Sequence, residues 1–217
     1  MSRTCLSVNM AMTLDGKVCR PDGKWYGLSS RNDKRRMDQL RAEADALLLG
    51  KNSLLQDDPV THLRYVEGKS DPRPVILIRT GTLPVDRKVF RHSKTKPLVY
   101  CTEKNAKEVR STLSELTEIC VLGPEDIEST DVLRDLGTRG YSNVLLEGGP
   151  RLNDSFFRKN LVDKINLTIV PFVIGQEDLP SITGSSIAYE NFDLQSWKLI
   201  RTEVIEDEIF LQYERRQ

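Results

Sequence analysis

The sequence has few of the residues that build metal centres and disulfide frameworks. Among 217 residues there are four cysteines and two histidines. The cysteines form no CxxC pair, and His62 and His92 have no metal-ligand spacing to each other or to a cysteine. We therefore expect no metal site, and free cysteines in a reducing compartment.

Long apolar runs and a charge of one sign are missing as well. No run approaches the ~18 apolar residues that a membrane span needs, and we expect neither a span nor a secretory leader. Lys and Arg number 32, as do Asp and Glu, so the formal net charge is zero. This balance argues against a non-specific binder of nucleic acid or of acidic membranes. We expect a cytoplasmic protein that binds a small molecule.

Three common nucleotide and nucleophile motifs are also absent. No GxGxxG follows a predicted strand, which removes the usual dinucleotide fingerprint. The Gly-Lys pairs lack the spacing of a P-loop, and there is no GxSxG turn of a serine hydrolase. Kinase-like, ATPase and serine-hydrolase chemistry therefore have no support in the sequence.

What is present is a regular alternation of short apolar runs with helical patterns. Strands are predicted at residues 4–12, 46–49, 74–78, 98–101, 119–122, 143–147 and 163–174, and helices at 30–44, 105–116, 129–136 and 150–157. Residues 197–204 and 208–214 predict a hairpin that turns at Glu206-Asp207. The alternation indicates one α/β domain over residues 1–217, with a mixed, mostly parallel sheet and a C-terminal antiparallel hairpin. Residues 51–73 are predicted to form a long functional or flexible excursion.

The most informative stretch spans residues 145–152, Leu-Leu-Glu-Gly-Gly-Pro-Arg-Leu. It indicates a strand, a tight turn and a helix start, with Pro150 at the first helical position. The glycines allow a ligand to approach the backbone closely, and the helix start favours an anion such as phosphate. An ordinary strand-to-helix connection without a ligand fits this stretch equally well.

Polar clusters follow several of the predicted strands. Asn9 and Asp15 flank the end of the first strand, residues 50–53 follow the second, and Arg79 follows the third. Glu147 follows a later one. In a parallel sheet, ligands bind at the carboxyl edge, so these clusters predict a crevice for a nucleotide and a polar substrate. Each cluster alone reads as a turn or as solvated surface.

Together and in this order, five blocks resemble a known family. They are residues 9–17 (NMAMTLDGK), residues 40–42 (LRA) leading into 49–53 (LGKNS), residues 57–59 (DDP) with Arg64, residues 147–153 (EGGPRLN) and residues 161–163 (LVD). The chain resembles the riboflavin-biosynthesis pyrimidine reductases, a module that elsewhere is fused behind a deaminase. The resemblance implies the dihydrofolate-reductase-like fold.

The resemblance also implies an activity. This is the NADPH-dependent reduction of a ribosylaminopyrimidine 5′-phosphate to the ribitylamino compound, with hydride passing to C1′ of the sugar. A homodimer is implied as well. No deaminase module is present, and Asn9 stands where fused members usually have lysine, so the diamino form of the pyrimidine is the expected substrate.

Site roles come from the same resemblance. Asn9, Arg41, Arg64 and Glu147 correspond to substrate-binding positions, and Asp57 and Glu147 to catalytic ones, with Asp57 or a bound water as proton source. The implied cofactor-binding residues are Ala11, Gly50, Ser53, Asp57, Arg79, Gly148, Gly149, Pro150, Arg151, Leu152 and Asn153. We expect Glu147→Ala and Arg64→Ala to lower activity strongly and to leave the fold intact.

Some positions depart from the family pattern. Gly27 stands where an aromatic residue is frequent, with Trp25 two positions earlier, and Ile78 replaces a frequent aspartate. Two alternatives therefore stay open. One is an NADPH reductase of this fold that acts on another small substrate, dihydrofolate included. The other is a cofactor-binding protein without turnover.

Overall fold

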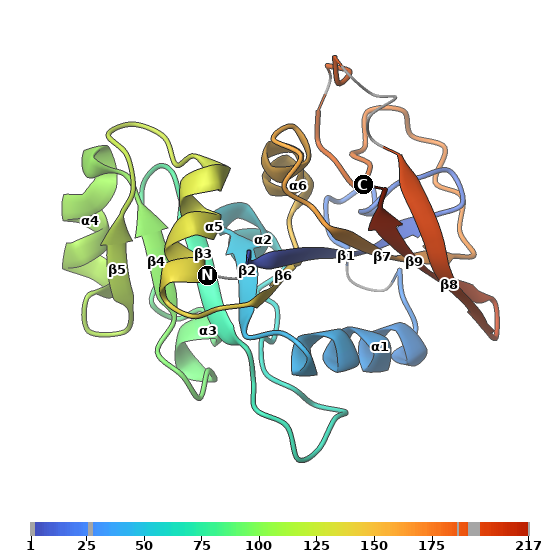
Figure 1. Cartoon of the computed structure of the whole chain (residues 1–217), viewed down its shortest axis with the longest axis horizontal. Helices are drawn as coiled ribbons and strands as arrows, with labels where there is room; N and C mark the ends of the chain where they lie inside the picture. The colour runs from blue at the N-terminus through green and yellow to red at the C-terminus, as the bar shows by residue number, and fades with distance from the viewer. Residues whose placement is uncertain (1–2, 26–27, 186, 191–195, 217) are drawn as a thin grey trace.

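One sheet of nine strands runs through the molecule (Figure 1). The computed structural model describes residues 3–25, 28–185, 187–190 and 196–216. The strands are β1 (Cys5–Thr13), β2 (Ala46–Gly50), β3 (Arg73–Ile78), β4 (Leu98–Cys101), β5 (Glu118–Val121), β6 (Asn143–Leu146), β7 (Lys164–Val170), β8 (Trp197–Ile205) and β9 (Glu208–Arg215). The helices are α1 (Arg31–Ala42), α2 (Lys51–Gln56), α3 (Lys88–Arg91), α4 (Glu103–Leu113), α5 (Ser129–Thr138) and α6 (Pro150–Phe157).

The strand order is β5-β4-β3-β2-β6-β1-β7-β9-β8. From β5 to β7 every pairing is parallel, whereas β9 runs antiparallel to β7 and β8 antiparallel to β9. The predicted mixed, mostly parallel sheet with a C-terminal hairpin is confirmed. Its turn lies at Glu206-Asp207, as predicted, and Glu206 adopts a φ of 55°.

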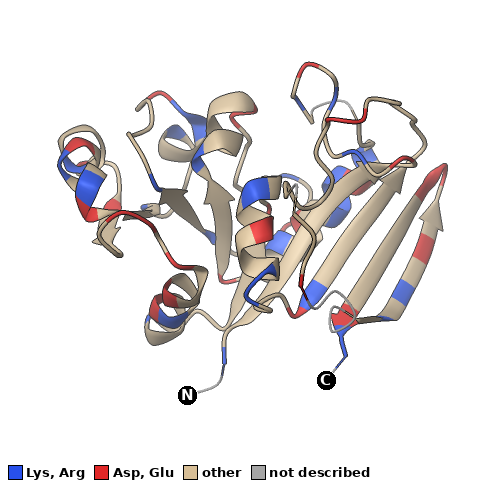
Figure 2. Ribbon diagram, turned by 90° about the horizontal axis from the view of Figure 1, so that it is seen from above, with Lys and Arg blue, Asp and Glu red and all other residues tan. Residues whose placement is uncertain are grey.

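The inner strands are apolar on both sides because helices cover both faces of the sheet (Figure 1). Leu47 and Leu49 of β2 belong to a buried cluster that also contains Leu54 of α2 and Val109 of α4. The intervening Leu48 belongs to a second cluster, which includes side chains of α5 and α6. Figure 2 shows the Lys, Arg, Asp and Glu residues interspersed over the helices and loops, in line with the balanced charge.

The structure corrects several predicted boundaries. The excursion at 51–73 begins with the six-residue helix α2, and the short helix α3 follows further on. β7 ends at Val170, before the proline that was expected inside the strand, because proline has no N–H for the ladder. α4 begins at Glu103 and ends at Leu113, with Thr102 and Asn105 forming a capping box. In the described part of the chain, every helix falls short of the length and apolar character that crossing a bilayer requires.

Candidate active site

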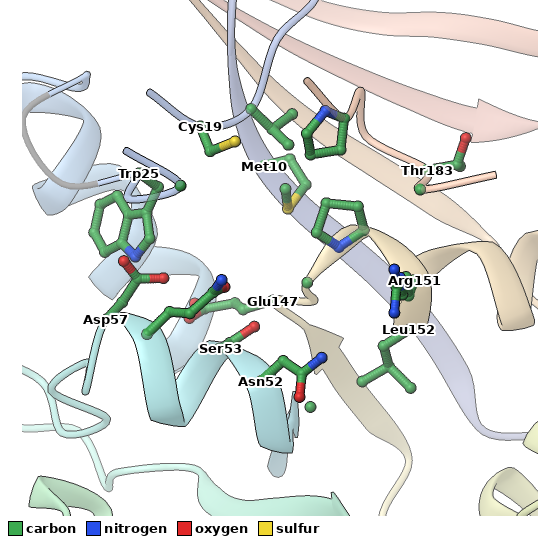
Figure 3. A pocket seen from close by; sticks show the side chains of 18 of the residues that line it. Met10, Cys19, Trp25, Asn52, Ser53, Asp57, Glu147, Arg151, Leu152 and Thr183 are labelled. Atoms are coloured by element: carbon green, nitrogen blue, oxygen red, sulfur yellow. The ribbon is translucent and has the colours of Figure 1, made fainter. Parts of the chain in front are cut away.

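A cleft of about 1100 Å³ opens at the carboxyl edge of the parallel strands. It brings together the polar clusters that follow β1, β2, β3 and β6, so the predicted crevice is present. Figure 3 shows Trp25 and Asp57 at one end, Arg151, Leu152 and Thr183 at the other, and Ser53 and Glu147 between them.

Most of the predicted site residues line this cleft. They are Asn9, Ala11, Arg41, Gly50, Ser53, Asp57, Arg79, Glu147, Gly149, Pro150, Arg151 and Leu152. Three predicted residues are not among the lining residues: Arg64, Gly148 and Asn153. Gly148 and Asn153 lie directly behind the lining, whereas the Arg64 side chain is exposed and lies over the ring of Tyr65 at 5.2 Å.

Arg41 and Glu147 form a bidentate ion pair at the base of the cleft. Nε and Nη2 of Arg41 donate to the two carboxylate oxygens of Glu147 at 2.8 and 2.6 Å. The Arg41 side chain is 1% exposed. Burial by itself would lower the pKa of this guanidinium, but the charge and hydrogen bonds of Glu147 outweigh it and raise the pKa. Such a bidentate pair fixes the position and orientation of the Glu147 carboxyl group.

The remaining contacts of Arg41 tie α1 to the loop that follows α2. Its Nη1 donates to the carbonyl of Val60 at 2.9 Å and lies 3.6 Å from Oδ1 of the fully buried Asp38. Oδ2 of Asp38 accepts from the backbone N–H of Arg64 and of Tyr65. The network therefore uses the backbone of Arg64, and the Arg41 guanidinium is occupied by protein groups.

A second wall of the cleft consists of backbone. The N–H of Gly50 donates to the carbonyl of Gly148 at 2.8 Å, which brings the starts of α2 and α6 together. Both helices have a glycine N-cap without a side-chain cap. Gly148 has a φ of 80°, and a Cβ on Gly149 would lie 3.2 Å from Oγ of Ser53. A side chain at Gly148 would be strained by the positive φ, and one at Gly149 would require Ser53 to shift, so the two glycines keep the main chain of this wall open.

Asp57 ends α2 beside Trp25 (Figure 3). Burial raises the pKa of its carboxyl group, although a backbone hydrogen bond from Trp25 opposes the shift. Its Oδ1 is buried without a hydrogen-bond partner in the described structure. A buried carboxyl group with a raised pKa and an unpaired oxygen is suited to hold a proton and to deliver it.

Two cations lie at the end of the cleft next to β3. Arg79 donates through Nε to Asp126 at 2.7 Å and remains about one-third exposed. The ammonium of Lys51 donates to the carbonyl of Thr80. Both side chains line the cleft.

Sequence reasoning missed several parts of the lining, among them the loop after β1 with Lys17, Cys19 and Trp25. The segment 177–185 closes one side, held by Asn153 Nδ2 on the carbonyl of Ile182 and by the N–H of Gly184 on that of Pro150. It is polar and without periodicity, so nothing in the sequence marks it. Asp33 on α1 was missed too, because an acidic residue in the first turn of a helix is too common to indicate a site.

The fold and the cleft define the class: an α/β protein of the dihydrofolate-reductase-like fold. The structure matches a dihydrofolate reductase from Enterococcus faecalis with a TM-score of 0.54 at 11% identity, over 98% of this chain and 97% of that one. It matches the bifunctional pyrimidine deaminase/uracil reductase of Thermotoga maritima with a TM-score of 0.83 at 21% identity. That match covers 99% of this chain but only 57% of the Thermotoga chain.

Residues 4–211 match the family model described as the RibD C-terminal domain, and the chain belongs to this family. A relative from Archaeoglobus fulgidus is 30% identical over 189 residues, covering 83% of this chain and 86% of its own length. One from Aquifex aeolicus is 28% identical over 193 residues, covering 85% and 84%. Both are named 2,5-diamino-6-ribosylamino-4(3H)-pyrimidinone 5′-phosphate reductase. The resemblance seen in the sequence blocks is confirmed, and the chain is an oxidoreductase of this family.

Proposed function

We propose that this chain reduces a ribosylaminopyrimidine 5′-phosphate to the ribitylamino compound with NADPH. The observation that carries the proposal is the pairing of two walls at one sheet edge. One wall is open glycine backbone at the starts of α2 and α6, and the other holds the buried Arg41–Glu147 pair. The names of the relatives supply the substrate class.

The residues present fit a dinucleotide. Helix starts without side-chain caps have N–H groups left for an anion, and the missing Cβ of Gly149, which lines the cleft, permits a close approach of the pyrophosphate. Gly50, Ser53 and residues 148–153 would hold this part of the cofactor, with Ala11 beside the nicotinamide. When bound, the cofactor supplies the hydride for C1′ of the sugar.

On the substrate side, Asn9 and Glu147 would bind the sugar hydroxyl groups. Because Arg41 is saturated by Glu147 and Val60, its role here is to position Glu147. Of the predicted substrate cations this leaves Arg64 for the 5′-phosphate, and its exposed guanidinium would have to turn from the Tyr65 ring toward the cleft to reach it. Reduction of an open-chain imine leaves a nitrogen that needs a proton, and Asp57 would donate it.

NADPH, in preference to NADH, is part of the proposal. Arg79 and Lys51 at the β3 end of the cleft are the cations placed to bind a 2′-phosphate. Equal rates with NADH and NADPH would remove this assignment. Homodimerisation, implied by the family resemblance, and a cytoplasmic location, expected from the composition, stay predictions; a monomer in light scattering would contradict the first.

The deciding experiment is an NADPH-oxidation assay with the diamino and the deaminated ribosylaminopyrimidine 5′-phosphates side by side. We expect turnover of at least one of them, with the ribitylamino compound as product. Tight NADPH binding without turnover of either would instead favour a reductase of another substrate or a non-catalytic cofactor-binding protein. Dihydrofolate serves as the third substrate in the same assay.

A further inference from the structure

A polar trio lies between α1 and the sheet, on the substrate side of the cleft. Asp33 of α1 is 8% exposed and Thr168 of β7 is fully buried. Oγ1 of Thr168 lies 2.6 Å from Oδ1 of Asp33 and 3.4 Å from Nη1 of Arg36. The function proposed above gives no role to any of the three.

The direction of these hydrogen bonds is fixed by chemistry. A guanidinium only donates, so Thr168 accepts from Arg36 and its single proton goes to Asp33. Arg36 is held in place by a second bond, from Nη2 to the carbonyl of Leu211 at 3.1 Å. Asp33 is therefore an acceptor, with the positive charge of Arg36 held beside it.

Asp33 also has a fixed place relative to the proposed substrate. It lines the cleft, as do Asn9 and Ala11 of β1. Ala11 pairs with Thr168 in the register of β1 and β7, so the Thr168–Asp33 bond lies beside the proposed nicotinamide position. The hydroxyl of Ser30 caps α1 at the backbone N–H groups of Asn32 and Asp33, which fixes the start of the helix.

We propose that Asp33 binds the pyrimidine ring and selects the diamino form over the deaminated form. This assignment rests on the function proposed above. A 2-amino-4(3H)-pyrimidinone presents two adjacent donors, the 2-amino group and N3–H, which match the two oxygens of a carboxylate. The corresponding edge of a uracil presents N3–H and the C2 carbonyl, and this carbonyl oxygen would face a carboxylate oxygen.

A buried group that loses its hydrogen-bond partner discriminates strongly between ligands. Sites of this kind reject analogues by about 10²-fold or more. We therefore expect kcat/KM for the diamino substrate to exceed that for the deaminated substrate by about 100-fold or more in the unmodified protein.

Asp33→Asn is the direct test, because an amide offers one acceptor and one donor. In this variant Oδ1 would still accept from Thr168 and from N3–H of either pyrimidine. Nδ2 would donate to the C2 carbonyl of the uracil, whereas in the diamino form it would face the 2-amino group, which is also a donor. We expect the preference for the diamino form to fall at least about 100-fold or to invert, with the Kd for NADPH unchanged. Asp131→Asn is the matched control, because Asp131 also lies in the first turn of a helix, α5, but its side chain is exposed to solvent.

Two further variants keep the test decisive if Asp33→Asn does not fold. Thr168→Val removes the hydroxyl that orients Asp33, whereas Thr168→Ser retains it; only the first should reduce the preference. Comparable rates on both pyrimidines in the unmodified protein, or equal losses on both in Asp33→Asn, would overturn the assignment alone. Turnover of neither pyrimidine by the unmodified protein would overturn the proposed function and this inference with it.

Discussion

The two walls of the cleft are built in opposite ways. The wall at the starts of α2 and α6 consists of main chain, and its value lies in the side chains that Gly148 and Gly149 lack. The wall under α1 consists of buried charges, each matched by a partner: Arg41 with Glu147, and Asp33 with Thr168. An added side chain should disrupt the backbone wall, whereas the removal of one partner should disrupt the charged wall.

The largest expected effect concerns Asp57, which lies at the end of α2 beside Trp25. We expect Asp57→Asn to lower kcat by about 10²- to 10⁴-fold, because the amide cannot supply a proton. The Kd for NADPH should change little. A steady-state assay with a Kd measured by fluorescence checks both, and near-normal kcat would leave bound water as the proton source.

Asp57→Asn should lower activity, but it should not lower the stability of the fold. Burial raises the pKa of Asp57, so the folded state binds this proton more tightly than the unfolded chain, whose pKa is ~3.9. This carboxyl therefore reduces stability as the pH rises from ~3.9 through the folded-state pKa. Asp57→Asn should be at least as stable as the unmodified protein at pH 7 in urea unfolding, and a clear loss of stability would contradict the burial argument.

Glu147→Ala breaks the charged wall. It leaves the Arg41 guanidinium buried beside Asp38 without its main partner, at a cost of about 3 kcal/mol or more in the free energy of unfolding. The structure thus revises the expectation from sequence that this variant keeps an intact fold. Glu147→Gln, which retains the shape, should cost less, so similar urea midpoints for Ala and Gln would argue against a structural ion pair.

Gly148→Ala breaks the backbone wall. The new Cβ would lie 3.2 Å from Asn153 Oδ1 at a φ of 80°, a conformation that costs alanine about 1–2 kcal/mol. Because a shift of Gly148 would move the neighbouring Gly149 in the cleft lining, we expect the Kd for NADPH to rise about 10-fold or more. Gly68→Ala is the matched control, because Gly68 has a φ of 71° in open space. If both variants bind NADPH equally well, the wall does not hold the cofactor.

Arg64→Ala should act more weakly than the sequence alone predicts. Its guanidinium is exposed over the ring of Tyr65, and only its backbone joins the Asp38 network. We expect a rise in KM of about 5-fold, corresponding to ~1 kcal/mol for an exposed charge, with kcat unchanged. A large loss of kcat in the steady-state assay would show that Arg64 belongs to the charged wall.

The smallest effect concerns Asp15, at the turn after β1. The Thr13 hydroxyl and the N–H groups of Gly175 and Ile174 lower its pKa to about 2. Its contribution is fully present above the unfolded pKa of ~3.9 and is lost as the pH falls toward 2. Asp15→Asn should flatten the acid limb of a stability–pH curve and leave NADPH affinity unchanged; an unaltered limb would contradict this.

The sequence predicted the sheet well because its inner strands are short runs that are apolar on both faces, such as 46–49 and 98–101. The backbone wall was equally visible, since a strand followed by Glu-Gly-Gly-Pro permits few structures. Helix α2 was missed because six residues with one fully buried side chain, Leu54, give no periodic signal.

The charged wall was predicted only through the family resemblance. No local pattern says that Arg41 faces inward and is neutralised by a residue 106 positions away. For the same reason the sequence could not distinguish Arg41 from Arg64, and both were assigned to substrate binding. In the structure Arg41 is buried and Arg64 is exposed. Pairing of distant charges is a property of packing, and the order of residues does not encode it locally.

The most direct test of the account is a crystal structure of the protein with NADPH and the diamino substrate bound. We predict the pyrophosphate within hydrogen-bond distance of main-chain N–H groups at 50–53 and 149–153, with the pyrimidine between α1 and β1. A dinucleotide or a pyrimidine bound outside the cleft, or both ligands on the same wall, would contradict it.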